Sequence, residues 1–261
     1  MAVRHISELE SQAIEFMRGR LSRPIALATT TLNLIGELVN LDTPAKLQKA
    51  QNVRLLLLER LQNDLRACWI LAERGYPLQA AGHAAGVYEA WVNIAAIGGE
   101  AAALKWLSHG DERTSFGQVK ALTRDAIEEI LGRSEPETVK SIYSQYGQLC
   151  MPKHLNPIVE RLRGYRVQRG EITFTQGPDT SELAVAHGWY SLERGSRFAF
   201  FGIVAFVHNE ASPLTSATRS DLDKLHADLE ALQRESMRLW PESYSRPRQE
   251  SVVASKVKET E

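Results

Sequence analysis

Arg219 and His226 are the residues whose types and spacing suggest the most specific reaction. Six residues separate them near the start of the last predicted helix. An arginine can stabilise the negative charge of a phosphate, and a histidine can move a proton during attack by a ribose 2′-hydroxyl. The pair is therefore a candidate for RNA cleavage. A simpler interpretation is an exposed helical face, because Glu230 follows His226 by one helical turn.

The same spacing resembles that of compact helical nucleases of the HEPN type, in which an arginine and a histidine lie four to six residues apart. The resemblance implies a metal-independent ribonuclease of a defence or toxin type. Ser220 stands where the polar residue after the family's arginine is expected. A chain with 31 lysines and arginines and 7 histidines also produces such a pair by chance. A ribonuclease is therefore the alternative function.

A second candidate site is a basic cluster that combines arginines with one tyrosine. Its members are Arg161, Arg163, Tyr165, Arg166 and Arg169. The arginines can bind phosphates and the tyrosine can stack on a base, so RNA is a possible partner. Glutamates flank the cluster at positions 160 and 171, and a solvated loop explains it equally well.

The sequence lacks the patterns that hold metals, nucleotides or catalytic serines. It has no His-Glu-x-x-His, no Cys-x-x-Cys and no paired Glu-x-x-His. The two glycines at 98 and 99 lack a following lysine, and no nucleophile elbow surrounds Ser191 or Ser196. We therefore expect no metal and no cofactor. His83 is expected to be a hydrogen-bonded core residue.

The composition is that of a globular cytosolic protein. Of the 261 residues, 43% are hydrophobic and 24% are charged, and the net charge of −1 argues against general electrostatic capture of nucleic acid or membrane. Cys68 and Cys150 are far apart and are expected to be reduced thiols. The N-terminus has no signal-peptide core. The most apolar run, 198–207, is about half as long as a membrane-spanning helix.

The clearest structural pattern is a pair of adjoining helices across residues 51–98. Apolar residues in the first helix recur at steps of three and four, which is the spacing of one helical face. They are Leu58, Leu61, Leu65, Cys68 and Ala72. Gly75 and Pro77 interrupt the pattern, and the second helix is rich in alanine and glycine. The sequence therefore predicts a packed helical hairpin.

Similar patterns predict helices on both sides of this hairpin. They cover residues 6–17, 25–39, 100–108, 116–131, 134–146, 179–208 and 222–239. Two of them are expected to begin at box-like caps, Ser134 with Glu137 and Asp179 with Glu182.

These elements predict an all-α fold, an irregular bundle of about seven to nine helices. A single domain is expected over residues 1–240. It is interrupted at 151–178 by an irregular insert that can hold a short β-hairpin. The polar residues 241–261 lack apolar periodicity and are expected to form a disordered tail.

The last predicted helix carries leucines in a heptad pattern. They are Leu222, Leu225, Leu229 and Leu232. Two hypotheses follow, because the pattern is too short for a secure coiled coil. The leucines either pack on their own domain, or they form a seam for self-association or for an unknown protein partner.

Three segments of the central region occur in a characteristic order. They are the break Arg-Gly-Tyr-Pro at 74–77, the stretch Tyr-Glu-Ala-Trp at 88–91, and a helix with Ile-Tyr at 142–143 that leads to Cys150 and His154. Over residues 51–156 they resemble a helical prokaryotic family designated domain of unknown function 5677. In that family an arginine precedes the glutamate and a serine precedes the histidine. Here Ala85 or Gly86 stands in place of the arginine, and Cys150 near the serine.

This resemblance nominates Glu89 and His154 as a polar pair. A carboxylate and an imidazole that meet between helices can do acid–base work, because burial and pairing move both pKa values towards neutrality. A buried hydrogen-bonded pair that fixes helix packing is the other interpretation. The first functional hypothesis is a cytosolic helical binding or interaction module that does not contact membranes.

Overall fold

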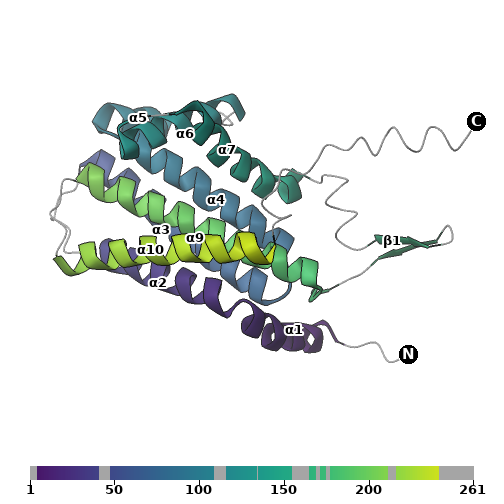
Figure 1. The fold of residues 1–261 in the computed structure, drawn as a ribbon. Coiled ribbons are helices and arrows are strands. Elements are labelled where there is room, and N and C mark those ends of the chain that lie inside the picture. The colour runs from purple at the N-terminus through teal and green to yellow at the C-terminus, as the bar shows by residue number, and fades with distance from the viewer. Residues whose placement is uncertain are drawn as a thin grey trace, which may run out of the picture.

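The structure, a computed structural model, is all-α, which confirms the predicted fold class (Figure 1). It describes residues 5–40, 48–108, 116–133, 135–154, 165–168, 171–174, 177–210 and 216–240. These residues form nine α-helices, one 3-10 helix and a two-stranded antiparallel sheet. Residues 241–261, for which the sequence predicts a disordered tail, lie outside the described residues.

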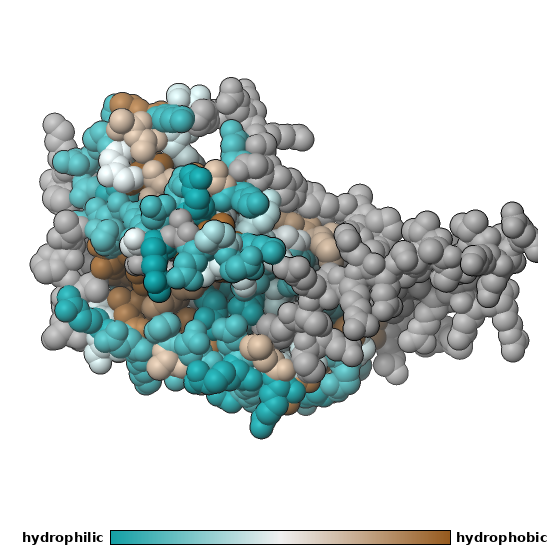
Figure 2. Space-filling model, turned by 45° about the horizontal axis from the view of Figure 1, so that its top comes forward, coloured by the Kyte–Doolittle hydropathy of each residue, from teal (hydrophilic) through white to brown (hydrophobic). Residues whose placement is uncertain are grey.

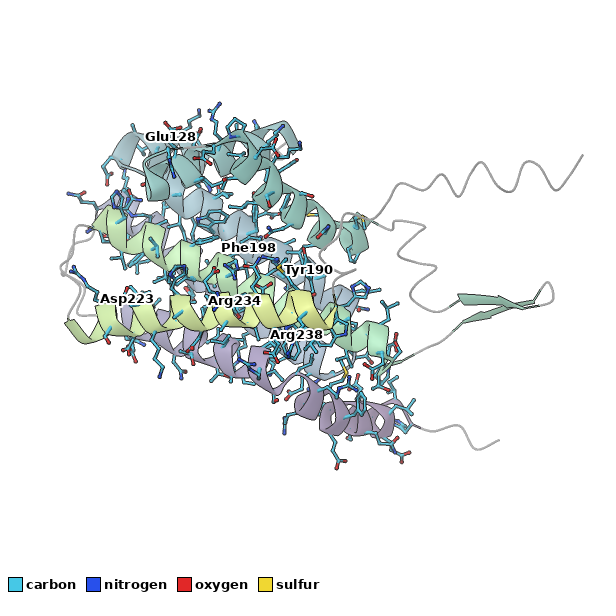
Figure 3. All side chains as sticks on the ribbon, in the orientation of Figure 1. Glu128, Tyr190, Phe198, Asp223, Arg234 and Arg238 are labelled. Carbon is cyan, nitrogen blue, oxygen red and sulfur yellow. The ribbon has the colours of Figure 1, made fainter. Side chains whose placement is uncertain are left out.

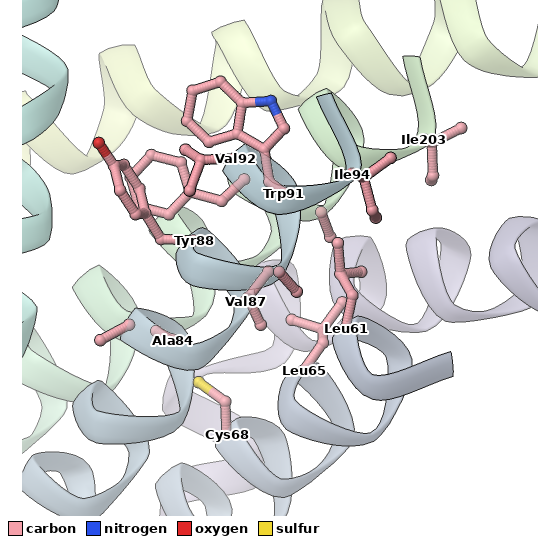
Figure 4. Packing of buried hydrophobic residues seen from close by; sticks show 14 of the residues in the cluster. Leu61, Leu65, Cys68, Ala84, Val87, Tyr88, Trp91, Val92, Ile94 and Ile203 are labelled. Carbon is pink, nitrogen blue, oxygen red and sulfur yellow. The ribbon is translucent and has the colours of Figure 1, made fainter. Parts of the chain in front are cut away.

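Three helices form the centre of the bundle: α3 (Lys49–Glu73), α4 (Pro77–Ala96) and α9 (Glu182–Glu210). The hairpin of α3 and α4 agrees with the sequence prediction. Gly75 has a φ of +82°, a conformation that favours glycine, and Pro77 begins α4. Figure 4 shows Leu61 and Leu65 of α3 next to Val87 of α4, and Ile203 of α9 next to Ile94 of α4. The local break thus folds two apolar faces into one core.

Two groups of helices cover this centre on opposite sides (Figure 1). On one side lie α1 (Ile6–Arg20), α2 (Ser22–Val39) and α10 (Ser216–Leu239). On the other side lie α5 (Glu100–Ser108), α6 (Phe116–Leu131) and α7 (Pro136–Cys150). The 3-10 helix η1 (Met151–His154) continues α7 and packs against α4.

The irregular insert contains two short strands, β1 (Tyr165–Gln168) and β2 (Glu171–Phe174). They pair antiparallel, with Tyr165 opposite Phe174 and Gln168 opposite Glu171. Both strands lie within the insert at 151–178, for which the sequence allows a short β-hairpin.

The heptad leucines of α10 are core residues of the same chain. Leu225, Leu229 and Leu232 are almost fully buried, and Leu222 is 8% exposed. The helix packs on α9 and α2. These leucines therefore pack on their own domain, which agrees with the first of the two hypotheses, and self-association of the protein stays a prediction.

Both predicted capping boxes need correction. Ser181 caps α9, because its hydroxyl accepts a hydrogen bond from the Ala184 amide, while Asp179 accepts one from the Ser181 amide. Helix α7 begins after Glu135, and Ser134 lies outside the described residues. The sequence pattern located these two helix caps to within about two residues.

Cys68 and Cys150 are both buried, and neither forms a disulfide bond within the part of the chain that the structure describes. Burial raises the pKa of the Cys68 thiol far above its ordinary value, and the charge of Asp64 adds to the effect. Among the described helices, none combines the length and the apolar character needed to span a membrane.

Candidate functional site

Helix α7 has two faces of different character. Its apolar face, with Val139, Tyr146 and Leu149, is buried. The other face carries polar side chains at alternating steps of three and one, so they line one side of the helix. They are Glu137, Lys140, Ser141, Ser144, Gln145 and Gln148. A polar face of this kind normally meets only solvent.

Here the polar face of α7 borders a cavity of about 310 Å³, and the opposite wall comes from α9. All six polar residues of α7 line it, together with Tyr190 and Arg194 of α9. The Tyr190 hydroxyl donates a hydrogen bond to Gln148 Oε1, which connects the two walls. Figure 3 shows Tyr190 and Phe198 along α9, in the interior of the bundle. The cavity therefore lies between a polar wall and a buried one.

Arg194 is the buried cation of this cavity. Its residue is only 3% exposed, and its Nε lies 3.1 Å from Oε2 of Glu193, which is fully buried. Glu193 does not line the cavity, whereas Arg194 does. Of the two charged residues in this ion pair, Arg194 is therefore the one that a ligand in the cavity can meet.

Arg197 provides a second partner for the same carboxylate. Its Nε donates to Glu193 Oε1 at 3.0 Å, and its other nitrogens donate to Glu230 Oε1 at 2.6 Å and to the Leu229 carbonyl at 3.0 Å. Burial lowers the pKa of Arg197, but the charge of Glu193 and the hydrogen bond to Glu230 raise it by more. Arg197 thus satisfies both Glu193 and the backbone of α10, and it joins α9 to α10.

Tyr190 is held neutral beside Arg194. Burial raises its pKa to about 12, although the charge of Arg194 lowers it in part. The guanidinium carbon of Arg194 lies 5.4 Å from the centre of the tyrosine ring. This geometry allows a cation–π interaction that supports the guanidinium on one side. A neutral hydroxyl can keep donating to Gln148 across the physiological pH range.

Two exposed residues that line the cavity carry charges of opposite sign. Lys140 Nζ lies 3.4 Å from Glu137 Oε1, and both side chains are largely exposed. Exposed ion pairs of this kind contribute little energy, so Lys140 can exchange its partner for a ligand. Ser141 and Ser144, which carry hydroxyl groups, line the same cavity. The arrangement offers cations, hydroxyls and amides to an anionic group.

The predicted residue Glu89 lies on α4, and its Oε1 accepts a hydrogen bond of 2.9 Å from the Tyr146 hydroxyl. Burial raises the pKa of Tyr146, and Cys150 and Glu89 raise it further, so the hydroxyl remains a neutral donor. The backbone of η1, which ends at His154, packs against α4. The side chain of His154 lies outside the described residues. These contacts join the two elements as a whole, so a pairing of Glu89 with His154 stays a prediction.

Arg219 and His226 are both exposed on α10. Seven positions along a helix return to nearly the same side, about 10.5 Å further along the axis. The His226 ring stacks on Phe200 of α9, with ring centres 5.3 Å apart. Neither residue lines the α7–α9 cavity.

The basic cluster of the insert falls largely outside the described residues, which exclude Arg161, Arg163 and Arg169. Tyr165 and Arg166 begin β1, and their side chains are not among those described. No metal-binding group of three or more His, Cys, Asp or Glu occurs among the residues that the structure describes.

His83 has the predicted hydrogen bond but not the predicted burial. Its Nδ1 lies 2.9 Å from Asp64 Oδ1, and its side chain is 42% exposed. Arg60 Nε lies 3.7 Å from the other oxygen of Asp64. The prediction of a core histidine is therefore wrong, because α4 presents this position to the surface beside α3.

The α7–α9 cavity is the site that the sequence interpretation missed. A signal was present, since Glu193, Arg194 and Arg197 interrupt a long helix that is otherwise rich in apolar and small residues. Charged residues in such a position are buried only when they are paired, and buried charges often mark functional sites. Their partner α7 could not be inferred from this signal.

Comparisons with known proteins place no relative beside this chain: no family model, no curated protein and no solved structure matches it.

Proposed function

We propose that this protein is a binding module, and that it holds a small ligand by an anionic group, a phosphate or a carboxylate, in the α7–α9 cavity. The observation that supports this proposal most directly is the position of Arg194. Its side chain is buried, yet it lines a cavity whose other lining residues are almost all polar. Arginine is well suited to bind such groups because its planar fork of donors matches their oxygens.

The ion pairs of α9 favour a ligand-binding role over a purely structural one. Even without Arg194, Glu193 has a salt-bridge partner in Arg197, which also contacts Glu230. Arg194 therefore adds a second cation to a carboxylate that already has one. Taking another charge out of water costs free energy, and hydrogen bonds to a ligand offset part of that cost.

The cavity also has suitable dimensions. Its volume of about 310 Å³ is at the lower end of the range typical of small-molecule sites. The hydroxyls of Ser141 and Ser144 and the amides of Gln145 and Gln148 supply both donors and acceptors. A small polar anion that enters the cavity can therefore exchange its hydrogen bonds to water for hydrogen bonds to these side chains.

Isothermal titration of the full chain with inorganic phosphate and with acetate tests this proposal. We expect saturable binding of at least one anion, with a Kd of about 1 mM or lower. Lys140→Ala should weaken binding, and Ser144→Phe should abolish it by filling the cavity. Lys224→Ala is the matched control, because Lys224 is exposed on α10, on the other side of the bundle.

The outcomes separate specific from general binding. Equal losses in Lys140→Ala and Lys224→Ala would indicate a general charge effect and contradict the proposed site. The same conclusion would follow if Ser144→Phe bound both anions as well as the wild type does. Circular dichroism of each variant checks that the helical content is unchanged.

The alternative proposal is RNA cleavage by Arg219 and His226. Their exposure on the same side of α10 supports it, because both side chains can then meet one strand. Incubation with total RNA tests it, beside Arg219→Ala and His226→Ala of matched helical content. Cleavage that both substitutions abolish would establish the ribonuclease. Intact RNA with the wild-type protein would exclude it under the conditions used.

A further inference from the structure

A second cavity adjoins the α7–α9 cavity on the other side of α7. It has a volume of about 520 Å³ and lies between α6 and α7. Its lining comprises Lys120, Ala121, Arg124, Pro136, Glu137, Val139 and Lys140. Glu137 and Lys140 line both cavities. One ligand can therefore extend from the first cavity to the second across the beginning of α7.

The α6–α7 cavity differs from its neighbour in chemistry. Its apolar part consists of Ala121, Pro136 and Val139, and its cations are Lys120, Arg124 and Lys140. Arg124 Nε and one terminal nitrogen contact Asp125 Oδ1 at 2.9 and 2.6 Å, and both side chains are exposed. The cavity thus combines an apolar surface with cationic donors, whereas the α7–α9 cavity is polar throughout.

We propose that the ligand is a nucleoside phosphate, an inference that rests on the proposed function. Its phosphate lies in the α7–α9 cavity near Arg194 and Lys140. Its base and ribose lie in the larger α6–α7 cavity. A base presents an apolar face, which suits Ala121, Pro136 and Val139. Its ring nitrogens and carbonyl oxygens accept hydrogen bonds, which suits Lys120 and Arg124.

Charge supports a mononucleotide over a long strand. Glu137 lines both cavities, and the whole chain carries a net charge of −1. A polyanion gains most from a continuous basic surface, whose counterions are released on binding. A ligand with a single phosphate and an uncharged ring gains from the two adjoining cavities instead. On the face of the molecule that Figure 2 shows, most of the described surface is hydrophilic, with smaller hydrophobic areas.

Titration calorimetry with inorganic phosphate, phenyl phosphate and the four nucleoside monophosphates tests the inference. We expect at least one nucleotide to bind about ten-fold more tightly than inorganic phosphate, a difference of about 1.4 kcal/mol. Ala121→Phe should remove that gain by filling the α6–α7 cavity, with the affinity for inorganic phosphate unchanged. Ala101→Phe, at an exposed position of α5, is the matched control.

Glu137→Gln provides a second, independent variant. Removal of its negative charge should tighten binding of the nucleotide, because Glu137 lines both cavities and its charge repels the phosphate. Glu135→Gln serves as its control, since Glu135 is exposed nearby but lines neither cavity. If Glu135→Gln raised the affinity for the nucleotide as much as Glu137→Gln does, the proposed position of the phosphate would be contradicted.

Failure of this inference differs from failure of the proposed function. If inorganic phosphate binds in the α7–α9 cavity but no nucleotide binds more tightly, the proposal of a nucleoside phosphate is wrong. The proposed anion site is then still supported. If neither binds, both are wrong. A short oligonucleotide that binds more tightly than every mononucleotide, with affinity falling steeply with salt, would overturn the mononucleotide and indicate a nucleic-acid surface.

Discussion

Arg194 Nε lies 3.1 Å from Glu193 Oε2, although consecutive residues of a helix project about 100° apart. Both side chains are buried near the middle of α9, the longest of the described helices. Arg197 contacts the other carboxylate oxygen from one turn further along. One buried carboxylate thus holds two arginines, of which one joins α10 and the other lines the α7–α9 cavity.

Removal of this carboxylate should strongly destabilise the protein. Glu193→Ala leaves two arginines beside an apolar side chain, and breaking a buried ion pair typically costs about 3–5 kcal/mol. Urea unfolding followed by circular dichroism measures the free energy of unfolding. Glu230→Gln is the matched variant, because Glu230 also pairs with Arg197 but has a side chain that is 40% exposed. We expect it to cost less than about 1 kcal/mol. Similar losses in both variants would contradict the role assigned to Glu193.

Two glycines of α4, one helical turn apart, should respond in opposite ways to alanine. A Cβ atom at Gly82 would meet nothing within 4 Å, so Gly82→Ala should stabilise the helix by about 0.5–1 kcal/mol. A Cβ atom at Gly86 would lie 2.6 Å from Asp64 Oδ2, so this carboxylate, which also contacts His83, would have to move.

We therefore expect Gly86→Ala to be about 1–2 kcal/mol less stable than Gly82→Ala, as overpacking predicts. Thermal unfolding of both variants measures the difference. The His83 ring signals in NMR spectra should change more in Gly86→Ala than in Gly82→Ala. Equal stability of the two variants would show that the Asp64 side chain moves aside without a cost in free energy.

The stability of the protein should fall below pH 6.5 partly because of His187. This residue lines a cavity at the beginnings of α4 and α9, and its Nε2 is buried without a hydrogen-bond partner among the described residues. Burial lowers its pKa, although Asp179 raises it in part. The folded protein therefore keeps the ring neutral, while the unfolded chain takes up a proton below about pH 6.5.

Proton uptake by the unfolded state lowers the free energy of unfolding as the pH falls, by at most about 1.4 kcal/mol per pH unit for one histidine. Above pH 6.5 this contribution is absent. Urea unfolding at pH 8 and pH 5.5 should show a smaller acid-induced loss in His187→Gln than in the wild type. His208→Gln, at an exposed position near the end of α9, should behave as the wild type. An unchanged loss in His187→Gln would assign the effect to other groups.

The sequence alone determined the helices and the principal break between them. Apolar steps of three and four, as at Leu61, Leu65 and Cys68, reveal a helical face because the period of the helix is a local property. Gly75 and Pro77 indicated the turn because their backbone preferences do not depend on distant residues. The buried thiols followed from the position of Cys68 within an apolar face.

The tertiary structure alone decided what each face meets. The leucines of α10 fit a core and a seam equally well until α9 and α2 were seen to cover them. Likewise, the sequence predicted a hydrogen bond for His83 but not its exposure at the surface. Arg194 and Ser144 come from segments 50 positions apart in the sequence and line one cavity. Periodicity shows which side chains share a face, whereas the pairing of distant faces depends on how the whole bundle packs.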